Sequence, residues 1–415
     1  MGKISALFLP NLTARILILE LSRRVQSIKE SPTLAVTARA AKLKAEGKDI
    51  IGLGAGEPDF DTPQHIKDAA KQAIDRGFTK YTPVAGIPGL KKAIVAKFQR
   101  ENGFEYSEKE VIVGVGGKQC IFNLALAVLN PGDEVITAAP YWVSYADIAM
   151  VAEAKPVIIQ CGIEQGFKLT AVQLQAAITP KTRMFIINSP SNPTGAVYSL
   201  AELKALADVL KKHPNILVAT DDMYEHVNLT GEKFCNILNA APELKDRTVV
   251  LNGVSKAYSM TGWRIGYAAG PANIIKAMEI LQSQSTSNPT SISQVAAQAA
   301  LEGSQECIEP MVKAFRERHA FVVDRFNQMP GIKCITAGGA FYAFPDAREA
   351  ISNLHKAGKI GAPTDMALSE YLLEKVGVAV VPGSAFGAEG YFRISFATSM
   401  ENLKNALDRI ASALA

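Results

Sequence analysis

Residues 252–267 read NGVSKAYSMTGWRIGY and join two short apolar runs, 249–252 and 265–269. Lys256 follows directly after the first run, among small and polar residues. Short, nearly continuous apolar runs are typical of strands that are buried on both faces of a sheet. In such sheets, ligand-binding groups lie on the loops that follow the strands. The stretch therefore places a lysine where an α/β sheet has its active site.

The same kind of run recurs along the chain and alternates with helical patterns. Further runs lie at 111–115, 134–138, 156–160, 183–188 and 216–221, and helical patterns at 118–129 and 200–212. This alternation predicts an α/β fold whose mostly parallel seven-stranded sheet is flanked by helices. After residue 302, apolar residues recur at steps of three and four, which predicts one long helix that Pro330 and Gly331 end.

A different pattern follows this long helix. Short strand patterns lie at 339–344, 378–381 and 392–395, and helical patterns at 366–375 and 400–413. Strands and helices of this length, without the earlier alternation, predict a smaller α+β domain at the C-terminal end.

Composition narrows the class of protein. The chain has 415 residues, 48% of them hydrophobic and 20% charged, and a net charge of +4, which gives no reason to expect nucleic acid or an anionic membrane as a partner. Its five cysteines are widely spaced and predict neither a disulfide framework nor a zinc site, so we expect no metal and a cytoplasmic location. No apolar run is long enough to span a membrane.

The N-terminal residues have a composition of their own. Residues 1–20 have two cations and no acid before Glu20, as in a targeting peptide. Because Pro10 breaks the apolar run, we favour an N-terminal arm.

Lys256 and Arg264 together suggest a cofactor. A desolvated lysine near other cations loses its proton readily and forms Schiff bases. Arg264 lies eight residues further on, before the run 265–269, and a planar guanidinium suits a phosphate dianion. A Schiff-base lysine beside a phosphate anchor points to pyridoxal 5'-phosphate.

The motif S-K-x-x-x-M-T-G-W-R-x-G-Y resembles the cofactor-lysine motif of the fold-type I, class I/II aminotransferases, and the likeness extends from about residue 22 to the C-terminus. The resemblance implies a pyridoxal-phosphate-dependent transferase that works as a homodimer with shared active sites. We expect an arm at 1–30, a small domain from 31–63 and 330–415, a large cofactor domain at 64–303 and a linking helix at 304–329.

The resemblance also implies roles for the cofactor-binding residues, each quoted in its motif. In NSPSNPTG, Asn192 donates to the cofactor's phenolate oxygen, and in DDMY, Asp221 pairs with the pyridine nitrogen while Tyr224 gives the phenolate a second hydrogen bond. In GVGGKQ, Gly116 and Gly117 form a phosphate cup at a helix N-terminus. Asp222, the other acid of DDMY, is given no role.

Five further positions match with roles at the substrate or the cofactor. Trp142 of PYW stacks on the pyridine ring and, with Asn192, also faces the substrate. Gly56 and Arg393 are expected to bind the substrate α-carboxylate. Tyr81 is expected to reach the phosphate in the neighbouring subunit. Ser255 is a weaker candidate for the phosphate, because relatives carry their serine where this chain has Gly253.

The substrate prediction depends on Lys118. The stretches VGGKQ, PYWVSY, NPTGAVY and QSQST resemble subgroup 1b of the family, in which the lysine of GGKQ meets the distal carboxylate of a dicarboxylic amino acid. We therefore predict transamination between L-aspartate and 2-oxoglutarate. The alternatives are a prephenate aminotransferase, an aromatic or alanine aminotransferase, a lyase on the same scaffold, and a regulator that only senses the cofactor.

Overall fold

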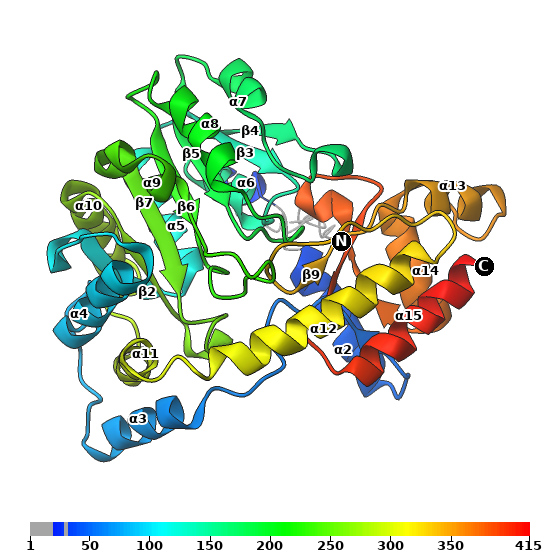
Figure 1. Ribbon diagram of the computed structural model, residues 1–415, viewed down its shortest axis with the longest axis horizontal. Helices are drawn as coiled ribbons and strands as arrows, with labels where there is room; N and C mark the ends of the chain where they lie inside the picture. Colours follow the sequence, from blue (N-terminus) through cyan, green and yellow to red (C-terminus); the bar gives the residue numbers. More distant parts are fainter. Residues whose placement is uncertain (1–19, 29–31) are drawn as a thin grey trace, which may run out of the picture.

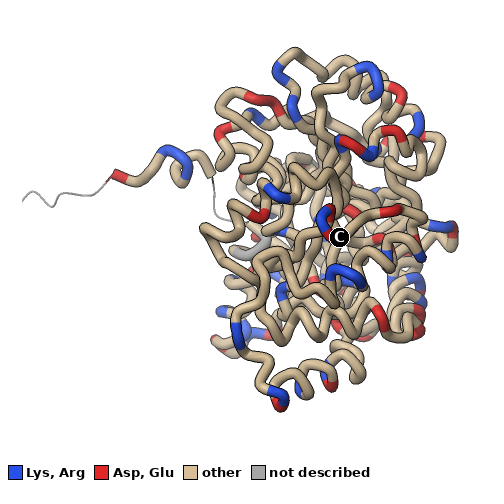
Figure 2. The backbone as a smooth tube through the Cα atoms, turned by 90° about the vertical axis from the view of Figure 1, so that its left-hand side faces the viewer, with Lys and Arg blue, Asp and Glu red and all other residues tan. Residues whose placement is uncertain are grey.

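The computed structural model describes residues 20–28 and 32–415, so most of the predicted N-terminal arm lies outside the described residues. A short helix, α1 (Arg23–Gln26), belongs to the described part of the arm. Among the described residues, no helix is both long and apolar enough to cross a membrane. Positive and negative residues are interspersed over the side of the molecule shown in Figure 2, as a net charge of +4 suggests.

A seven-stranded sheet forms the centre of the larger body (Figure 1). Its strands, in spatial order, are β2 (Val111–Val115), β8 (Ile265–Ala269), β7 (Thr248–Gly253), β6 (Leu217–Asp221), β5 (Thr182–Asn188), β3 (Glu134–Ala139) and β4 (Lys155–Gln160). Strand β8 runs in the direction opposite to the other six strands. The predicted seven strands and the mostly parallel sheet are thus confirmed, and each strand end lies within one residue of its predicted position.

Helices cover both faces of this sheet. One face carries α5 (Gly117–Val128), α6 (Ser144–Val151) and α10 (Ala272–Ser283). The other carries α4 (Pro88–Lys97), α7 (Ala171–Ala177), α8 (Leu200–Leu210), α9 (Ile237–Ala240) and α11 (Ser291–Glu302), and α3 (Gln64–Asp75) packs against α11. Side chains along a strand alternate between these layers: Phe185 and Ile187 pack into one core, Met184 and Ile186 into the other. Two apolar layers explain why the strands are nearly continuous apolar runs.

A third core holds the smaller body together. It is built around α12 (Ile308–Asn327), α13 (Arg348–Lys356), α14 (Asp365–Val376), α15 (Met400–Leu414) and the strands β9 (Tyr342–Ala343) and β12 (Phe392–Ser395). Helix α2 (Pro32–Ala45) lies beside it, and β1 (Ile51–Gly52) pairs in parallel with β10 (Val378–Ala379). Residues 32–52 and the C-terminal segment from α12 onward, which are far apart in the sequence, therefore meet in one body (Figure 1). The domain boundaries given above stay a prediction.

One predicted strand is divided in the structure. The run 378–381 forms two short strands, β10 and β11 (Val381–Pro382), because β10 pairs with β1 whereas β11 pairs with β12. The remaining elements are the π-helix η1 (Phe98–Asn102) and the 3₁₀ turns η2 (Glu108–Glu110), η3 (Ile163–Gln165), η4 (Pro242–Arg247), η5 (Thr261–Trp263) and η6 (Gly383–Phe386).

The sheet topology brings the predicted site residues to one edge of the sheet. Strands β2, β3, β5, β6 and β7 share a direction, so the residues that follow them emerge at the same edge. Strand β8 runs the other way and begins at that edge, where Ile265 pairs with Val115. Arg264, just before β8, is thereby brought beside the loop that follows β2.

Candidate active site

A pocket of about 290 Å³ opens at this edge, between the sheet and the smaller body. All the predicted site residues line it except Gly116 and Tyr81. Those that line it are Gly56, Gly117, Lys118, Trp142, Asn192, Asp221, Tyr224, Ser255, Lys256, Arg264 and Arg393. Residues that are scattered over most of the sequence therefore converge on one cavity.

Lys256 stands on the loop that follows β7. Its Nζ atom lies 2.5 Å from the carbonyl oxygen of Gly56, to which it donates. Burial, helped by the nearby Arg264 and Arg393 cations, lowers the pKa of Lys256 to about 8, against the opposing effects of Glu57 and Asp221. A lysine with this pKa is neutral in about a tenth of the molecules at pH 7, far more than an ordinary lysine, so it can act as a nucleophile or a base.

One end of the pocket is suited to a phosphate. Helix α5 begins here with Gly116 at its N-cap, and no side chain caps it. Gly116 has φ 78°, and a Cβ atom on it would collide with the guanidinium of Arg264. Gly116 is therefore packed behind Arg264, while Gly117 and Ser255 line the pocket. Free N–H groups at a helix N-terminus, beside a guanidinium, make a ready anion site.

Asp221 lines the pocket at the point where β6 ends. The Tyr145 hydroxyl donates to its carboxylate at 2.5 Å, and the Met223 N–H donates at 3.2 Å. Burial raises the pKa of Asp221, while these two hydrogen bonds favour its charged form. Trp142 packs edge-on against Tyr145, with ring centroids 5.3 Å apart, so an aromatic wall stands beside the acid.

Arg393 and Asn192 form a third group. Arg393 is 2% exposed; its Nη1 donates to Asn192 Oδ1 at 2.9 Å and its Nη2 to the Gly54 carbonyl at 2.7 Å. Its Nε, although buried, has no hydrogen-bond partner. A buried donor without an acceptor is costly, so this edge of the guanidinium is the natural place for a ligand's carboxylate.

Lys118 lines the pocket, whereas Tyr81 does not. The Nζ of Lys118 sits 5.1 Å from the centre of the Trp142 ring, and burial together with Arg264 lowers the Lys118 pKa. Lys118 thus faces the pocket rim, although a lysine near a helix N-terminus would otherwise extend into solvent. Tyr81 is 93% exposed and does not line the pocket of its own chain.

The pocket also contains residues that sequence reasoning missed, chiefly Tyr145, Asn188 and Tyr342. Two of them had a signal in the sequence. Asn188 ends strand β5 at the ligand-binding edge, and Tyr145 lies one helical turn after Trp142. Tyr342 had none, because it comes from β9 in the smaller body.

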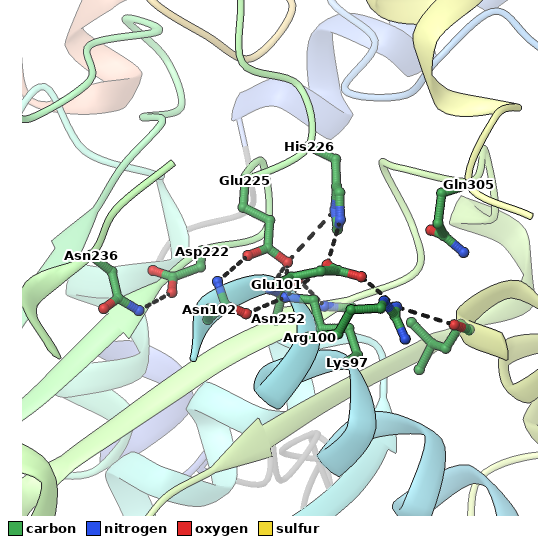
Figure 3. A network of polar contacts seen from close by, with 12 residues as sticks. Lys97, Arg100, Glu101, Asn102, Asp222, Glu225, His226, Asn236, Asn252 and Gln305 are labelled. Atoms are coloured by element: carbon green, nitrogen blue, oxygen red, sulfur yellow. Dashed lines mark hydrogen bonds and ion pairs between the residues drawn. The ribbon is translucent and has the colours of Figure 1, made fainter. Parts of the chain in front are cut away.

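A second cluster of charges surrounds Glu225, outside the residues that line the pocket (Figure 3). The ammonium of Lys97 contacts the carboxylate of Glu225, and Asn102 and Asn252 donate to the same carboxylate at 3.0 and 2.8 Å. The π-helix η1 has the spacing that brings Asn102, five residues after Lys97, within 2.8 Å of the Lys97 Nζ. We call Lys97, Asn102, Glu225 and Asn252 the rear network.

The rear network extends toward Asp222 and His226. Asp222 accepts from Thr220 and from Asn236, both at 2.6 Å, and burial raises its pKa to about 7. Glu101, Glu225 and His226 offer ligand atoms within 4.8 Å of one another, a spacing that would suit a metal. The Lys97 ammonium already supplies the positive charge there, since it contacts Glu225 and lies 3.5 Å from Glu101.

Comparison with known proteins now identifies the family. The sequence pattern of "Aminotransferase class I and II" matches residues 48–410. The chain belongs to the class I and II aminotransferases. Both the family predicted from the motifs and the enzyme class are therefore confirmed.

Individual relatives of this aminotransferase cover almost its whole length. The aspartate/prephenate aminotransferase of Nitrosomonas europaea is 64% identical over 95% of this chain and 100% of its own. The crystal structure of the Rhizobium meliloti aspartate aminotransferase superposes with a TM-score of 0.90, at 50% identity over 95% of this chain and 99% of its own. The Thermus thermophilus aspartate aminotransferase with maleate gives a TM-score of 0.89, at 44% identity over 95% of this chain and 100% of its own.

Proposed function

We propose that this aminotransferase exchanges the amino group of L-aspartate with 2-oxoglutarate, with pyridoxal phosphate as its cofactor. The observation that carries the proposal is the placement of two cations, Arg393 and Lys118, in the same pocket as Lys256. Arg393 presents an unpartnered Nε, which suits the α-carboxylate, and Lys118 stands at the rim, where a distal carboxylate would lie. The Thermus thermophilus relative, solved with the dicarboxylate maleate, supports a dicarboxylic substrate.

The residues present fit pyridoxal phosphate. The uncapped start of α5, Arg264 and Ser255 would hold the phosphate. Asp221 would pair with the ring nitrogen, and Tyr224 and Asn192 would donate to the ring oxygen. When bound, this cofactor supplies an aldehyde that condenses with amines and a ring that withdraws electrons from the substrate Cα.

Side chains of this protein would orient the substrate and accept its proton. Arg393 orients the α-carboxylate through charge-assisted hydrogen bonds, and Lys118 orients the distal one. The Lys256 Nζ would hold the cofactor through its amine and, when that amine is free, would accept the proton from the substrate Cα. Its lowered pKa of about 8 allows both roles, because each requires the neutral amine.

We also propose a homodimer whose active sites are shared. Tyr81 is predicted to bind the phosphate, yet its side chain is 93% exposed and lies outside the pocket of its own chain. A second copy that covers this surface would bring Tyr81 to the partner's phosphate site. A Tyr81→Phe variant should then bind the cofactor more weakly, and sedimentation should show a dimer.

A second candidate acceptor is prephenate. The Nitrosomonas europaea relative bears both aspartate and prephenate in its name, and prephenate also carries two carboxylates. The pocket offers the same two cations to either molecule, so one enzyme would use both.

Spectroscopy and a donor panel test the proposal. Purified protein with pyridoxal phosphate should show a visible Schiff-base band that Lys256→Ala alters or abolishes. Aspartate should then be the preferred donor to 2-oxoglutarate, with prephenate assayed as an alternative acceptor. Lys118→Ala should raise KM for aspartate far more than for alanine. Absence of the band in the wild-type protein would refute the cofactor, and equal KM changes would refute the role of Lys118.

A further inference from the structure

Tyr342 touches two of the groups on which the proposed reaction depends. It lies on β9, which pairs antiparallel with β12, the strand that carries Arg393. Its side chain is completely buried and lines the pocket. Sequence reasoning gave it no role, and two of its contacts are with the predicted site residues Tyr224 and Arg393.

The first contact joins two phenols. The hydroxyl oxygens of Tyr342 and Tyr224 lie 2.8 Å apart, which is hydrogen-bond distance. Burial raises the pKa of both tyrosines, so both carry their proton at neutral pH. Each hydroxyl has a single proton, so one phenol donates and the other accepts. If Tyr224 directs its proton at a ligand oxygen, then its own oxygen is left to accept from Tyr342.

The second contact holds the guanidinium. The central carbon of the Arg393 guanidinium lies 4.4 Å from the centre of the Tyr342 ring and 5.0 Å from that of Phe386. The cation is thus held by ring contacts as well as by its bonds to Asn192 and Gly54. Held in this way, Arg393 keeps its unpartnered Nε in place for a carboxylate.

We propose that Tyr342 is a positioning residue that links the two halves of the site: its hydroxyl donates to Tyr224, so that Tyr224 donates to the ring oxygen of pyridoxal phosphate, and its ring fixes Arg393 for the substrate α-carboxylate. This rests on the proposed function, because both ligands belong to it. Tyr342 itself is assigned no contact with the reacting atoms.

The hydroxyl is tested by Tyr342→Phe, which keeps the ring. Without a donor from Tyr342, Tyr224 becomes a weaker and less directed donor, so the ionised ring oxygen is less stabilised. The spectral pKa of the Schiff-base band of the loaded enzyme should rise by about half a pH unit. The value of kcat/KM for aspartate should fall about tenfold.

A double-mutant cycle shows whether the effect passes through Tyr224. In a Tyr224→Phe background, the change Tyr342→Phe should shift the spectral pKa no further. Tyr106→Phe is the matched control: it removes a buried hydroxyl that has no partner, beside Phe98 and Lys245, and should leave both readouts unchanged.

The ring is tested by Tyr342→Leu. Loss of the cation–π contact should raise KM for aspartate several-fold beyond the effect of Tyr342→Phe. A wild-type spectral pKa and kcat/KM in Tyr342→Phe, with a normal band in the wild-type protein, would overturn the positioning role alone. If the wild-type protein shows no band at all, the proposed function is wrong and the role of Tyr342 falls with it.

Discussion

This aminotransferase has two buried clusters of charge, one in the pocket and one in the rear network. In the rear network, the Lys97 ammonium contacts the Glu225 carboxylate, and two asparagines complete its coordination. In the pocket, Lys256 contacts only a carbonyl oxygen at hydrogen-bond distance, and Arg393 keeps an unpartnered Nε. Lys97 is completely buried and Lys256 partly buried, but only Lys97 has an anionic partner in contact.

Whether a buried charge has a partner decides whether it stabilises the fold or is available for catalysis. Burial alone would raise the pKa of Glu225, yet Lys97, His226 and Asn102 outweigh burial and lower it. In the pocket, burial and like charges act together and lower the pKa of Lys256 to about 8. A paired buried charge is fixed in one state, whereas an unpaired one is available to a ligand or a proton.

The largest effect is expected at Lys256. Lys256→Ala should reduce kcat by about 10⁴-fold, because the variant lacks both the amine that holds the cofactor and the base. The thermal midpoint of the apoenzyme should change little, since the lost group was a poorly solvated charge. Steady-state kinetics and calorimetry check the two halves of this expectation, and a variant that keeps turnover would contradict it.

Replacing the lysine of the rear network should affect stability instead of catalysis. Lys97→Met leaves the Glu225 carboxylate buried without its cation and should lower the free energy of unfolding by about 3–5 kcal/mol. The double variant Lys97→Met/Glu225→Leu should recover most of this loss. Urea unfolding measures both, and a stable single variant would show that the ion pair is not needed.

A smaller effect is expected when the positive charge at Arg393 is kept but the planar guanidinium is replaced by an ammonium. Arg393→Lys retains a cation without the planar fork, so KM for aspartate should rise about 10- to 100-fold. The variant should bind pyridoxal phosphate as tightly as the wild type, which a spectral titration measures. Equal weakening of cofactor and substrate would mean that Arg393 acts on the whole pocket.

The pH dependence gives the finest test. Below pH 8 the neutral fraction of Lys256 falls about tenfold per pH unit, so capture of pyridoxal phosphate by the apoenzyme should accelerate with pH and level off near 8. The visible band follows capture at Lys256, and Lys256→Ala is the control for reaction at surface lysines. A midpoint near 10.5, the ordinary value, would show that the pocket does not perturb this lysine.

Much of the site was determined by local sequence. Lys256, Asp221 and Asn192 each stand at or just after a strand end, and short apolar runs predict strands well when both faces are buried. The family motifs then assigned the roles. Parallel strand direction brings such residues to one edge, so they could be placed together before any contact was known.

The rest was decided by tertiary structure. Tyr342 lies in a stretch whose pattern predicts only a strand, and no motif marks Lys97. Their partners, Tyr224 and Glu225, are 118 and 128 positions away along the chain. A hydrogen bond or ion pair between distant segments leaves no periodic trace in either one. The sequence by itself thus determined the strands, the edge and the family's chemistry. Packing alone decided which buried charges would be paired and which would stay open to a ligand, because pairing depends on distances that only the folded chain defines.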